Sequence, residues 1–356
     1  MESSGNLVRV LTRLGRVSGT ILALAVSLAL AACSSSTTTP TTPTSSSTQM
    51  TDPSASASPA ASATPSGSAT PKPTIVPSTN TDAITVTGEF GKTPTVTVPS
   101  PWAIDTSQAR VLIPGTGPEL TATSMVEINY HGVNGRSGQV FDESFSSGQT
   151  ATFPLTGVIT GFATTLKGQK VGSRVLIAIT GPDGYDQAGG SPDAGIEVGD
   201  TLIFVVDIIS ATLPGPSGAS VTPAAGLPTV TGDLNKPVVT VDSKATPPTT
   251  LVVQPLITGT GRKLGANDGI QVNYAEVAWS TGKVVKQTYG YQPVTGTLDA
   301  TVPGWKDGLV GQTVGSRVLL VVPAAQAYPG GNRKIGVKEG ETMVYVIDIL
   351  FSQAGA

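Results

Sequence analysis

Cysteine and histidine are almost absent from this 356-residue chain, which contains one of each, Cys33 and His131. A single cysteine cannot form an intramolecular disulfide or a CxxC redox pair, and one cysteine with one histidine cannot build a Cys/His zinc cluster. The lone histidine is interpreted as a structural or surface residue, because no GxSxG nucleophile sequence accompanies it. We therefore expect a function that uses no metal and no cofactor.

Charged residues are scarce as well, at 13% of the chain with a net charge of −3. No basic run is present, so a nucleic-acid partner is not expected. Glycine and proline are abundant instead, with 42 and 28 residues. At roughly 100–200 residues per domain, this length and composition indicate two domains together with linker sequence.

The N-terminal segment 1–33 is typical of a secretory signal, with a basic start and an uncharged, mostly apolar stretch over 17–32. The stretch ends in Leu30-Ala31-Ala32-Cys33, which resembles the lipobox of bacterial lipoproteins, where the cysteine is acylated. An ordinary signal peptide with an incidental cysteine and an uncleaved anchor are the alternatives. Because the only cysteine stands at the small-residue cleavage site, we predict lipidation at Cys33 and an extracytoplasmic protein anchored to the cell membrane.

Residues 34–80 consist almost entirely of Ser, Thr, Pro and Ala. Such a segment has too little apolar mass to offset the entropy of an ordered chain, so we expect a disordered tether. Proline-rich chains are semi-rigid, and the tether would therefore hold the folded part away from the membrane.

The rest of the chain is an internal duplication with an offset of about 141–144 residues. Gly115-Thr116-Gly117 recurs as Gly259-Thr260-Gly261, and Val171–Val175 recurs unchanged as Val314–Val318. The offset is far above the 20–50 residues that are typical of solenoid repeats, so whole domains are duplicated. Without a following Lys-Ser/Thr, the Gly-Thr-Gly segments are interpreted as turns rather than phosphate loops.

The folded part of the chain is divided into two domains and a linker. We predict a first domain over 81–212, a Pro/Gly-rich linker over 213–228 and a second domain over 229–356. A Thr/Val-rich lead-in precedes each domain, at 83–98 and 229–241, and is expected to add an edge strand.

Each copy is mainly β in its pattern. In the first, the runs 126–130, 174–180 and 201–209 are rich in β-branched residues and are bounded by turn residues. One short helix is expected per copy, over 159–167 and 305–310. Strands around a single short helix favour an α+β fold with an antiparallel sheet.

Seven ordered blocks of the first copy together form a specific pattern: 126–132, 138–144, 153–155, 158–162, 172–174, 182–185 and 201–204. With these blocks, the region 107–211 resembles an FKBP-type peptidyl-prolyl cis-trans isomerase domain. The resemblance implies two FKBP-like domains, each an antiparallel half-barrel sheet wrapped around one short helix.

The resemblance also implies an apolar pocket in the first domain, with Phe162 as its floor where the family usually has Trp. Tyr185 would donate its hydroxyl to a substrate carbonyl, and the backbone N–H of Ile159 would be the other main donor. Ile196 would bind substrate, and Ala151 replaces an aromatic residue that many members have. The catalytic residues implied in this way are Tyr130, Phe141, Asp142, Val158, Ile159, Phe162, Tyr185 and Phe204.

The second copy, over 250–352, resembles the same family but is degenerate. A Val285-Lys286 pair replaces the Phe-Asp pair, and Thr301 and Pro303 crowd the entrance to the helix. A Trp floor argues for a surviving pocket, whereas the lysine argues for different ligands or weaker catalysis. Its implied substrate-binding residues are Tyr274, Val302, Trp305, Tyr328 and Tyr345, with Val337 at a further pocket position.

The function implied by the resemblance is isomerisation of Xaa-Pro bonds in newly secreted or cell-envelope proteins. Rotation about a peptide bond faces a barrier of about 18–20 kcal/mol, and only Xaa-Pro bonds populate the cis form appreciably. A dry, aromatic-lined site favours the twisted amide without a nucleophile or a metal. The partners expected are proline-containing polypeptides and macrolide immunosuppressants. A non-catalytic binding module or holdase for proline-containing segments is the alternative function.

Overall fold

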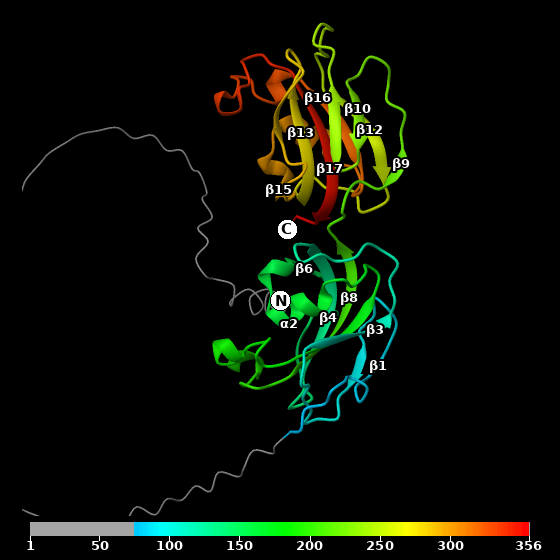
Figure 1. Cartoon of the computed structure of the whole chain (residues 1–356), viewed down its shortest axis with the longest axis vertical. Helices are drawn as coiled ribbons and strands as arrows, with labels where there is room; N and C mark the ends of the chain where they lie inside the picture. Colours follow the sequence, from blue (N-terminus) through cyan, green and yellow to red (C-terminus); the bar gives the residue numbers. More distant parts are fainter. Residues whose placement is uncertain (1–74, 356) are drawn as a thin grey trace, which may run out of the picture. The chain divides into compact units, whose positions relative to one another are not determined.

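The computed structural model describes residues 75–355. The predicted signal sequence, Cys33 and residues 34–74 of the predicted tether lie outside the described residues. Within 75–355, no helix is both long enough and apolar enough to cross a membrane. Two separate large antiparallel sheets form the framework of this region (Figure 1).

The first sheet has six strands in the order β3-β7-β8-β4-β5, with β6 paired to the other part of β4. Residues alternate between buried and half-buried along β4, as expected for a strand with one face on a core. All residues of β7 and nearly all of β8 are buried. The strands are β3 (Gln108–Ile113), β4 (Met125–Asn134), β5 (Val140–Glu143), β6 (Ala151–Pro154), β7 (Arg174–Ile179) and β8 (Leu202–Ala211).

Helix α2 (Thr160–Leu166) packs on one face of this sheet and buries Phe162 and Leu166. It follows a short 3₁₀ turn, η2 (Leu155–Gly157). The helix ends just before Gly168, whose φ of +83° is a left-handed conformation that favours glycine after a helix. The helix predicted over 159–167 is therefore confirmed, one residue shorter at each end.

The second sheet has seven strands in the order β14-β13-β17-β16-β12-β9, with β15 paired to β13. Strand β9 lies within the segment predicted as a linker, and it pairs with β12 through its three residues. The strands are β9 (Gly218–Ser220), β12 (Val252–Gly259), β13 (Gly269–Ala278), β14 (Lys283–Gln287), β15 (Val294–Thr297), β16 (Arg317–Val322) and β17 (Met343–Gln353).

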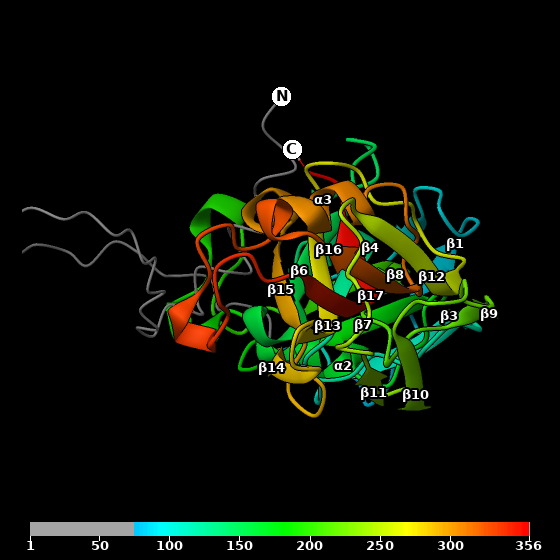
Figure 2. The same ribbon diagram turned by 90° about the horizontal axis from the view of Figure 1, so that it is seen from above.

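Helix α3 (Pro303–Leu309) follows η5 (Leu298–Ala300) and packs against β16 (Figure 2). It begins two residues earlier than predicted because Pro303 occupies the first turn, where its missing N–H has no partner to lose. The proline thus starts the helix rather than crowding it. Four further 3₁₀ turns are η3 (Asp186–Ala188), η4 (Pro192–Ala194), η6 (Ala324–Gln326) and η7 (Arg333–Ile335).

The two lead-in segments form separate two-stranded hairpins, so the expectation that they add edge strands is wrong. The physical reason is that the central strands are apolar on both faces, and the face away from the helix also needs a cover. In the first domain Ile84 and Trp102 pack over Leu176 and Ile203 there. The hairpins are β1 (Thr85–Thr87) with β2 (Thr95–Thr97), and β10 (Thr229–Asp233) with β11 (Lys236–Thr240).

A buried ion pair connects the first hairpin to the first sheet. Arg174, at the start of β7, places Nε 2.6 Å from Oδ1 of Asp207 on β8, and the two residues are 1% and 0% exposed. The same guanidinium donates to the carbonyl oxygens of Gly88 and Lys92 in the β1–β2 loop. The side chain of Arg174 therefore links strands β7 and β8 to the β1–β2 hairpin.

The duplicated Val-Gly-Ser-Arg-Val segment repeats this arrangement in the second domain. Arg317 pairs with Asp348 at 2.6 Å and donates to the carbonyl oxygen of Leu234 in the β10–β11 turn. The serine of the same segment also has a repeated role. Ser173 Oγ accepts from the N–H of Gly115, and Ser316 Oγ accepts from the N–H of Gly259, both at 2.9 Å.

We predict that replacing Arg174 by Met destabilises the first domain by about 3–5 kcal/mol, because the carboxylate of Asp207 is left buried without its partner. The measurement is urea unfolding followed by NMR at residues of the first sheet. Lys170→Met is the matched control, since Lys170 and Glu119 form an exposed pair at 3.9 Å and its loss should cost about 1 kcal/mol or less. Equal effects of the two variants would contradict the role given to the buried pair.

Candidate functional site

A row of aromatic rings lies between α2 and the first sheet. Phe162 is fully buried, and its ring meets the ring of Phe204 edge-on at 5.2 Å and the ring of Phe153 at 5.8 Å. Phe204 in turn meets Phe141 edge-on at 5.5 Å. Edge-to-face contacts of this kind fix the rings in place, so the floor and one wall of the site are rigid.

Gly132 on β4 is needed for this stacking. A Cβ atom at this position would lie 2.8 Å from the ring of Phe141 and 3.1 Å from the ring of Phe204. Real Cβ atoms essentially never show the first distance, and the second is tighter than nine in ten real contacts, so a side chain at 132 would require the Phe141 ring to move. Cross-strand pairing places Gly132 opposite Asp142 on β5 and Phe204 on β8.

A carboxylate and a tyrosine form a polar pair at the side of the aromatic row. The hydroxyl of Tyr130 donates to Oδ2 of Asp142 at 3.1 Å. Burial raises the pKa of Asp142 from 3.8 to about 6, and the hydrogen bond from Tyr130 opposes that rise because it stabilises the charged form. The same surroundings raise the pKa of Tyr130, mainly by burial, so its hydroxyl keeps its proton.

Two donors in this site have no partner within the described residues. The hydroxyl of Tyr185 is buried and makes no hydrogen bond, and burial raises its pKa above the usual value. The backbone N–H of Ile159, the residue before α2, also donates to no acceptor within residues 75–355. An unpartnered buried donor costs free energy that a bound acceptor would recover.

The structure brings together all nine first-domain residues that the resemblance implied. Six are buried in one cluster, Phe141 and Val158 are partly buried against it, and Asp142 is bonded to Tyr130. The small Ala151 is buried in the same cluster, opposite Ile128. The six buried residues are Tyr130, Ile159, Phe162, Tyr185, Ile196 and Phe204.

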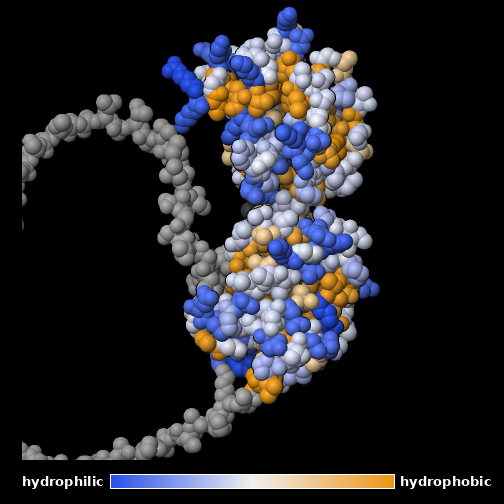
Figure 3. Space-filling view, viewed as in Figure 1, coloured by the Kyte–Doolittle hydropathy of each residue, from blue (hydrophilic) through white to orange (hydrophobic). Residues whose placement is uncertain are grey.

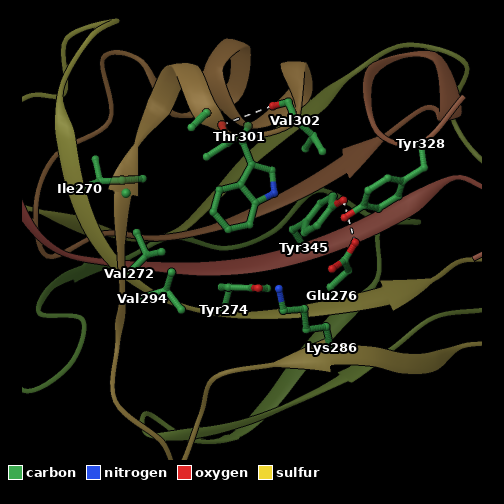
Figure 4. A pocket seen from close by; sticks show the side chains of 13 residues that line it. Ile270, Val272, Tyr274, Glu276, Lys286, Val294, Thr301, Val302, Tyr328 and Tyr345 are labelled. Carbon is green, nitrogen blue, oxygen red and sulfur yellow. Dashed lines mark hydrogen bonds between the residues drawn. The ribbon is translucent and has the colours of Figure 1, made fainter. Parts of the chain in front are cut away.

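The second domain contains a pocket of about 250 Å³ (Figure 4). Trp305, 6% exposed, meets Tyr274 edge-on at 5.0 Å and Tyr345 at 5.5 Å, and its Nε1–H has no hydrogen-bond partner. Val337 is buried in the surrounding cluster rather than in the lining. All five predicted substrate-binding residues line the pocket: Tyr274, Val302, Trp305, Tyr328 and Tyr345.

Glu276 also lines this pocket, and the sequence analysis missed it. Its carboxylate accepts from the hydroxyl of Tyr345 at 3.0 Å (Figure 4), and the Tyr328 hydroxyl lies close to the same group. Burial raises the pKa of Glu276, although the two hydroxyls and the charge of Lys286 oppose the rise. The internal duplication could have revealed this residue, because aligning Asn129-Tyr130 with Asn273-Tyr274 places Glu276 at the position of Gly132.

Lys286 stands at the rim of the second pocket. Its Nζ lies 5.7 Å from the centre of the Tyr274 ring, within the range of a cation–π contact (Figure 4). A hydrogen bond with the Tyr274 hydroxyl raises the pKa of Lys286. The lysine therefore remains a cation at the position where the first domain has a carboxylate.

The remaining polar features do not suggest another chemistry. His131 is half-buried on β4, its Nδ1 has no hydrogen-bond partner, and burial lowers its pKa. Within 75–355 no three His, Cys, Asp or Glu residues are grouped so that they could hold a metal ion. The surface seen in Figure 3 alternates between small polar and apolar areas.

Comparison with known proteins finds one family in both halves of the folded region. A model described as FKBP-type peptidyl-prolyl cis-trans isomerase matches residues 117–209 and 261–350, which together span just over half of the 356 residues. The two matches fall on the two sheets. The FKBP fold predicted from the sequence, with two domains of mostly antiparallel strands and few helices, is therefore confirmed.

Individual relatives match over about the length of one domain. A Corynebacterium glutamicum protein named "Probable FK506-binding protein" is 40% identical over 101 residues, covering 28% of this chain and 82% of the relative. "FK506-binding protein" of Streptomyces anulatus is 33% identical over 110 residues, covering 29% and 87%. "Peptidyl-prolyl cis-trans isomerase Mip" of Coxiella burnetii is 38% identical over 105 residues, covering 29% and 44%.

We predict that the carboxyl group of Asp142 titrates near pH 6 and that Tyr130→Phe moves its midpoint upward, because the bond that stabilises the charged form is lost. The ¹³C chemical shift of the carboxyl carbon measures this directly. Because the folded pKa exceeds the unfolded value of 3.8, the contribution of Asp142 to stability is present below pH 4 and declines as the pH rises through 6. A midpoint near 3.8 would contradict the burial of this group.

Proposed function

The chain belongs to the FKBP-type peptidyl-prolyl cis-trans isomerase family, and from this we propose that it isomerises Xaa-Pro bonds of secreted or cell-envelope polypeptides, mainly in its first domain. The observation that carries the proposal is the Tyr185 hydroxyl, a buried donor without a partner beside a fully buried aromatic floor. Such a donor needs an acceptor from outside the domain. A carbonyl of a bound peptide supplies one.

The chemistry follows from the environment of the bound amide. The proline ring rests on Phe162, and the Tyr185 hydroxyl and the Ile159 N–H donate to carbonyl oxygens of the peptide. Twisting the amide breaks its resonance, and the twisted form has less charge separation than the planar form. The planar amide therefore loses more on leaving water, and an apolar site lowers the barrier to rotation. No bond is made or broken with the protein.

The second domain is proposed to bind proline-containing segments with little or no catalysis. The hydroxyl of Tyr328, at the position of Tyr185, lies close to the buried carboxylate of Glu276, which accepts from Tyr345. A substrate carbonyl would therefore compete with this carboxylate for the Tyr328 hydroxyl. A binding role without catalysis is the alternative that this observation favours, for this domain only.

The N-terminal sequence adds a location to the proposal. Acylation of Cys33 after removal of the signal would anchor the protein to the outer face of the cell membrane, and residues 34–80 would tether the domains. The names of two relatives refer to FK506, so we also propose that macrolides compete for the first pocket. The large apolar surface of a macrolide suits the aromatic residues of the first-domain site.

We predict that Tyr185→Phe in the whole chain lowers kcat/KM for a Xaa-Pro peptide about tenfold, since one hydrogen bond to the substrate is worth about 1–1.5 kcal/mol. Exchange NMR between the cis and trans signals of the peptide measures the rate. Tyr328→Phe is the matched control and should leave the rate unchanged. Loss of activity in the control alone would move the catalytic site to the second domain.

A second prediction concerns the anchor. Cys33→Ser should abolish incorporation of a radiolabelled fatty acid and release the protein from the membrane fraction, because a serine cannot be acylated as a thioether lipid. Labelling that persists in Cys33→Ser would contradict lipidation at this residue. The control is the unmodified chain expressed in the same cells.

A further inference from the structure

The aromatic site of the first domain and the pocket of the second differ by a matched set of replacements on three neighbouring strands. In the first domain Gly132 leaves room for the rings of Phe141 and Phe204. In the second, the glycine is replaced by Glu276 and the phenylalanine of the short edge strand by Val285. The shorter valine opens the space that the glutamate side chain occupies.

The aromatic residue on the neighbouring central strand also differs between the two domains, as Phe204 in the first and Tyr345 in the second. Tyr345 stands opposite Glu276 in the strand pairing, as Phe204 stands opposite Gly132. The added hydroxyl of the tyrosine donates to the carboxylate at 3.0 Å. An edge-to-face contact between two rings is thus replaced by a buried hydrogen bond, and the carboxylate, 2% exposed, has a partner.

The same group of replacements also reverses the charge at the edge of the site, from a carboxylate to an ammonium. Lys286 replaces Asp142 opposite the changed position, and its side chain is exposed. The ammonium contacts Tyr274 but makes no ion pair with any described carboxylate within 4.0 Å. The ammonium therefore keeps donors available at the mouth of an aromatic pocket, although the carboxylate of Glu276 stands opposite it in the strand pairing.

The ammonium of Lys286 lies close enough to the indole of Trp305 for one short peptide to contact both. The Lys286 ammonium is 5.7 Å from the ring of Tyr274, and that ring is 5.0 Å from the ring of Trp305. Adjacent residues of a peptide have Cα atoms about 3.8 Å apart. A proline on the indole therefore places the side chain of its neighbour within reach of the ammonium.

We propose that the second pocket binds peptide segments in which an acidic residue directly precedes proline, with the proline on Trp305 and the carboxylate on Lys286. This inference rests on the proposed binding of proline-containing segments by the second domain. The unpartnered Nε1–H of Trp305 adds a donor for an acceptor atom of the ligand. A basic neighbour is disfavoured, because it would meet the like charge of Lys286, and the nearest carboxylate, Glu276, is buried and already accepts from Tyr345.

The indole of Trp305 provides a probe of this pocket within the intact chain. The first pocket has Phe162 at the same position, and the other two tryptophans lie in the apolar clusters on the opposite faces of the sheets. We would titrate the ¹⁵N-labelled chain with Ala-Glu-Pro-Phe, Ala-Gln-Pro-Phe and Ala-Lys-Pro-Phe peptides and follow the indole signal, assigned with Trp305→Phe. The Glu-Pro peptide should bind about fivefold tighter than the Gln-Pro peptide, and the Lys-Pro peptide more weakly than both.

The charge is tested by reversing it. Lys286→Glu should invert the order of the Glu-Pro and Lys-Pro peptides, whereas Lys283→Glu, the same change on the same strand outside the pocket, should leave the order intact. An unchanged order in Lys286→Glu, equal binding of the three peptides, or no shift of the Trp305 signal with any of them would overturn the proposal. Exchange NMR on the same samples reports the proposed isomerase activity separately, so the two proposals fail independently.

Discussion

A buried arginine–aspartate pair is the constraint on which each domain depends. Arg174 and Asp207 join the two most buried strands of the first sheet and hold the covering hairpin through two carbonyl oxygens. Strand β7 leads into the loop that carries Tyr185, and strand β8 carries Phe204. The ion pair that fixes these strands therefore also fixes one donor and one wall of the pocket.

The same framework supports two different pockets. Because Arg317 and Asp348 repeat the ion pair, the second sheet keeps its geometry while residues on its inner face change. Glu276 stands where the first domain has Gly132, a valine replaces the neighbouring ring, and Tyr345 supplies a hydroxyl that donates to the glutamate. In the first domain the Tyr185 hydroxyl has no partner, and in the second the Tyr328 hydroxyl lies close to the carboxylate of Glu276. The two copies therefore keep the ion pair that holds the fold and differ in the residues that line the binding site.

Much of this could be predicted from the sequence, and the limits have physical reasons. Strand patterns and the ordered blocks predicted the sheets, the helices and the group of residues around Phe162, because these depend on local periodicity and on a recognisable family pattern. The hairpins were mistaken for edge strands, although the near-continuous apolar runs of β7 and β8 indicate burial on both faces, because sequence does not show which segment covers the second face. Glu276 was missed because a single glutamate on a strand is usually solvated, and only its contacts with Tyr345 and Tyr328 show otherwise.

If the first domain acts as proposed, a proline residue of the bound peptide lies on the aromatic floor formed by Phe162. Isotope-filtered NOE spectra of the labelled chain with an unlabelled Xaa-Pro peptide test it most directly. We expect contacts from the proline ring protons to the side chains of Phe162, Ile159 and Tyr185, which all belong to one buried cluster. Proline contacts confined to residues outside that cluster would contradict it.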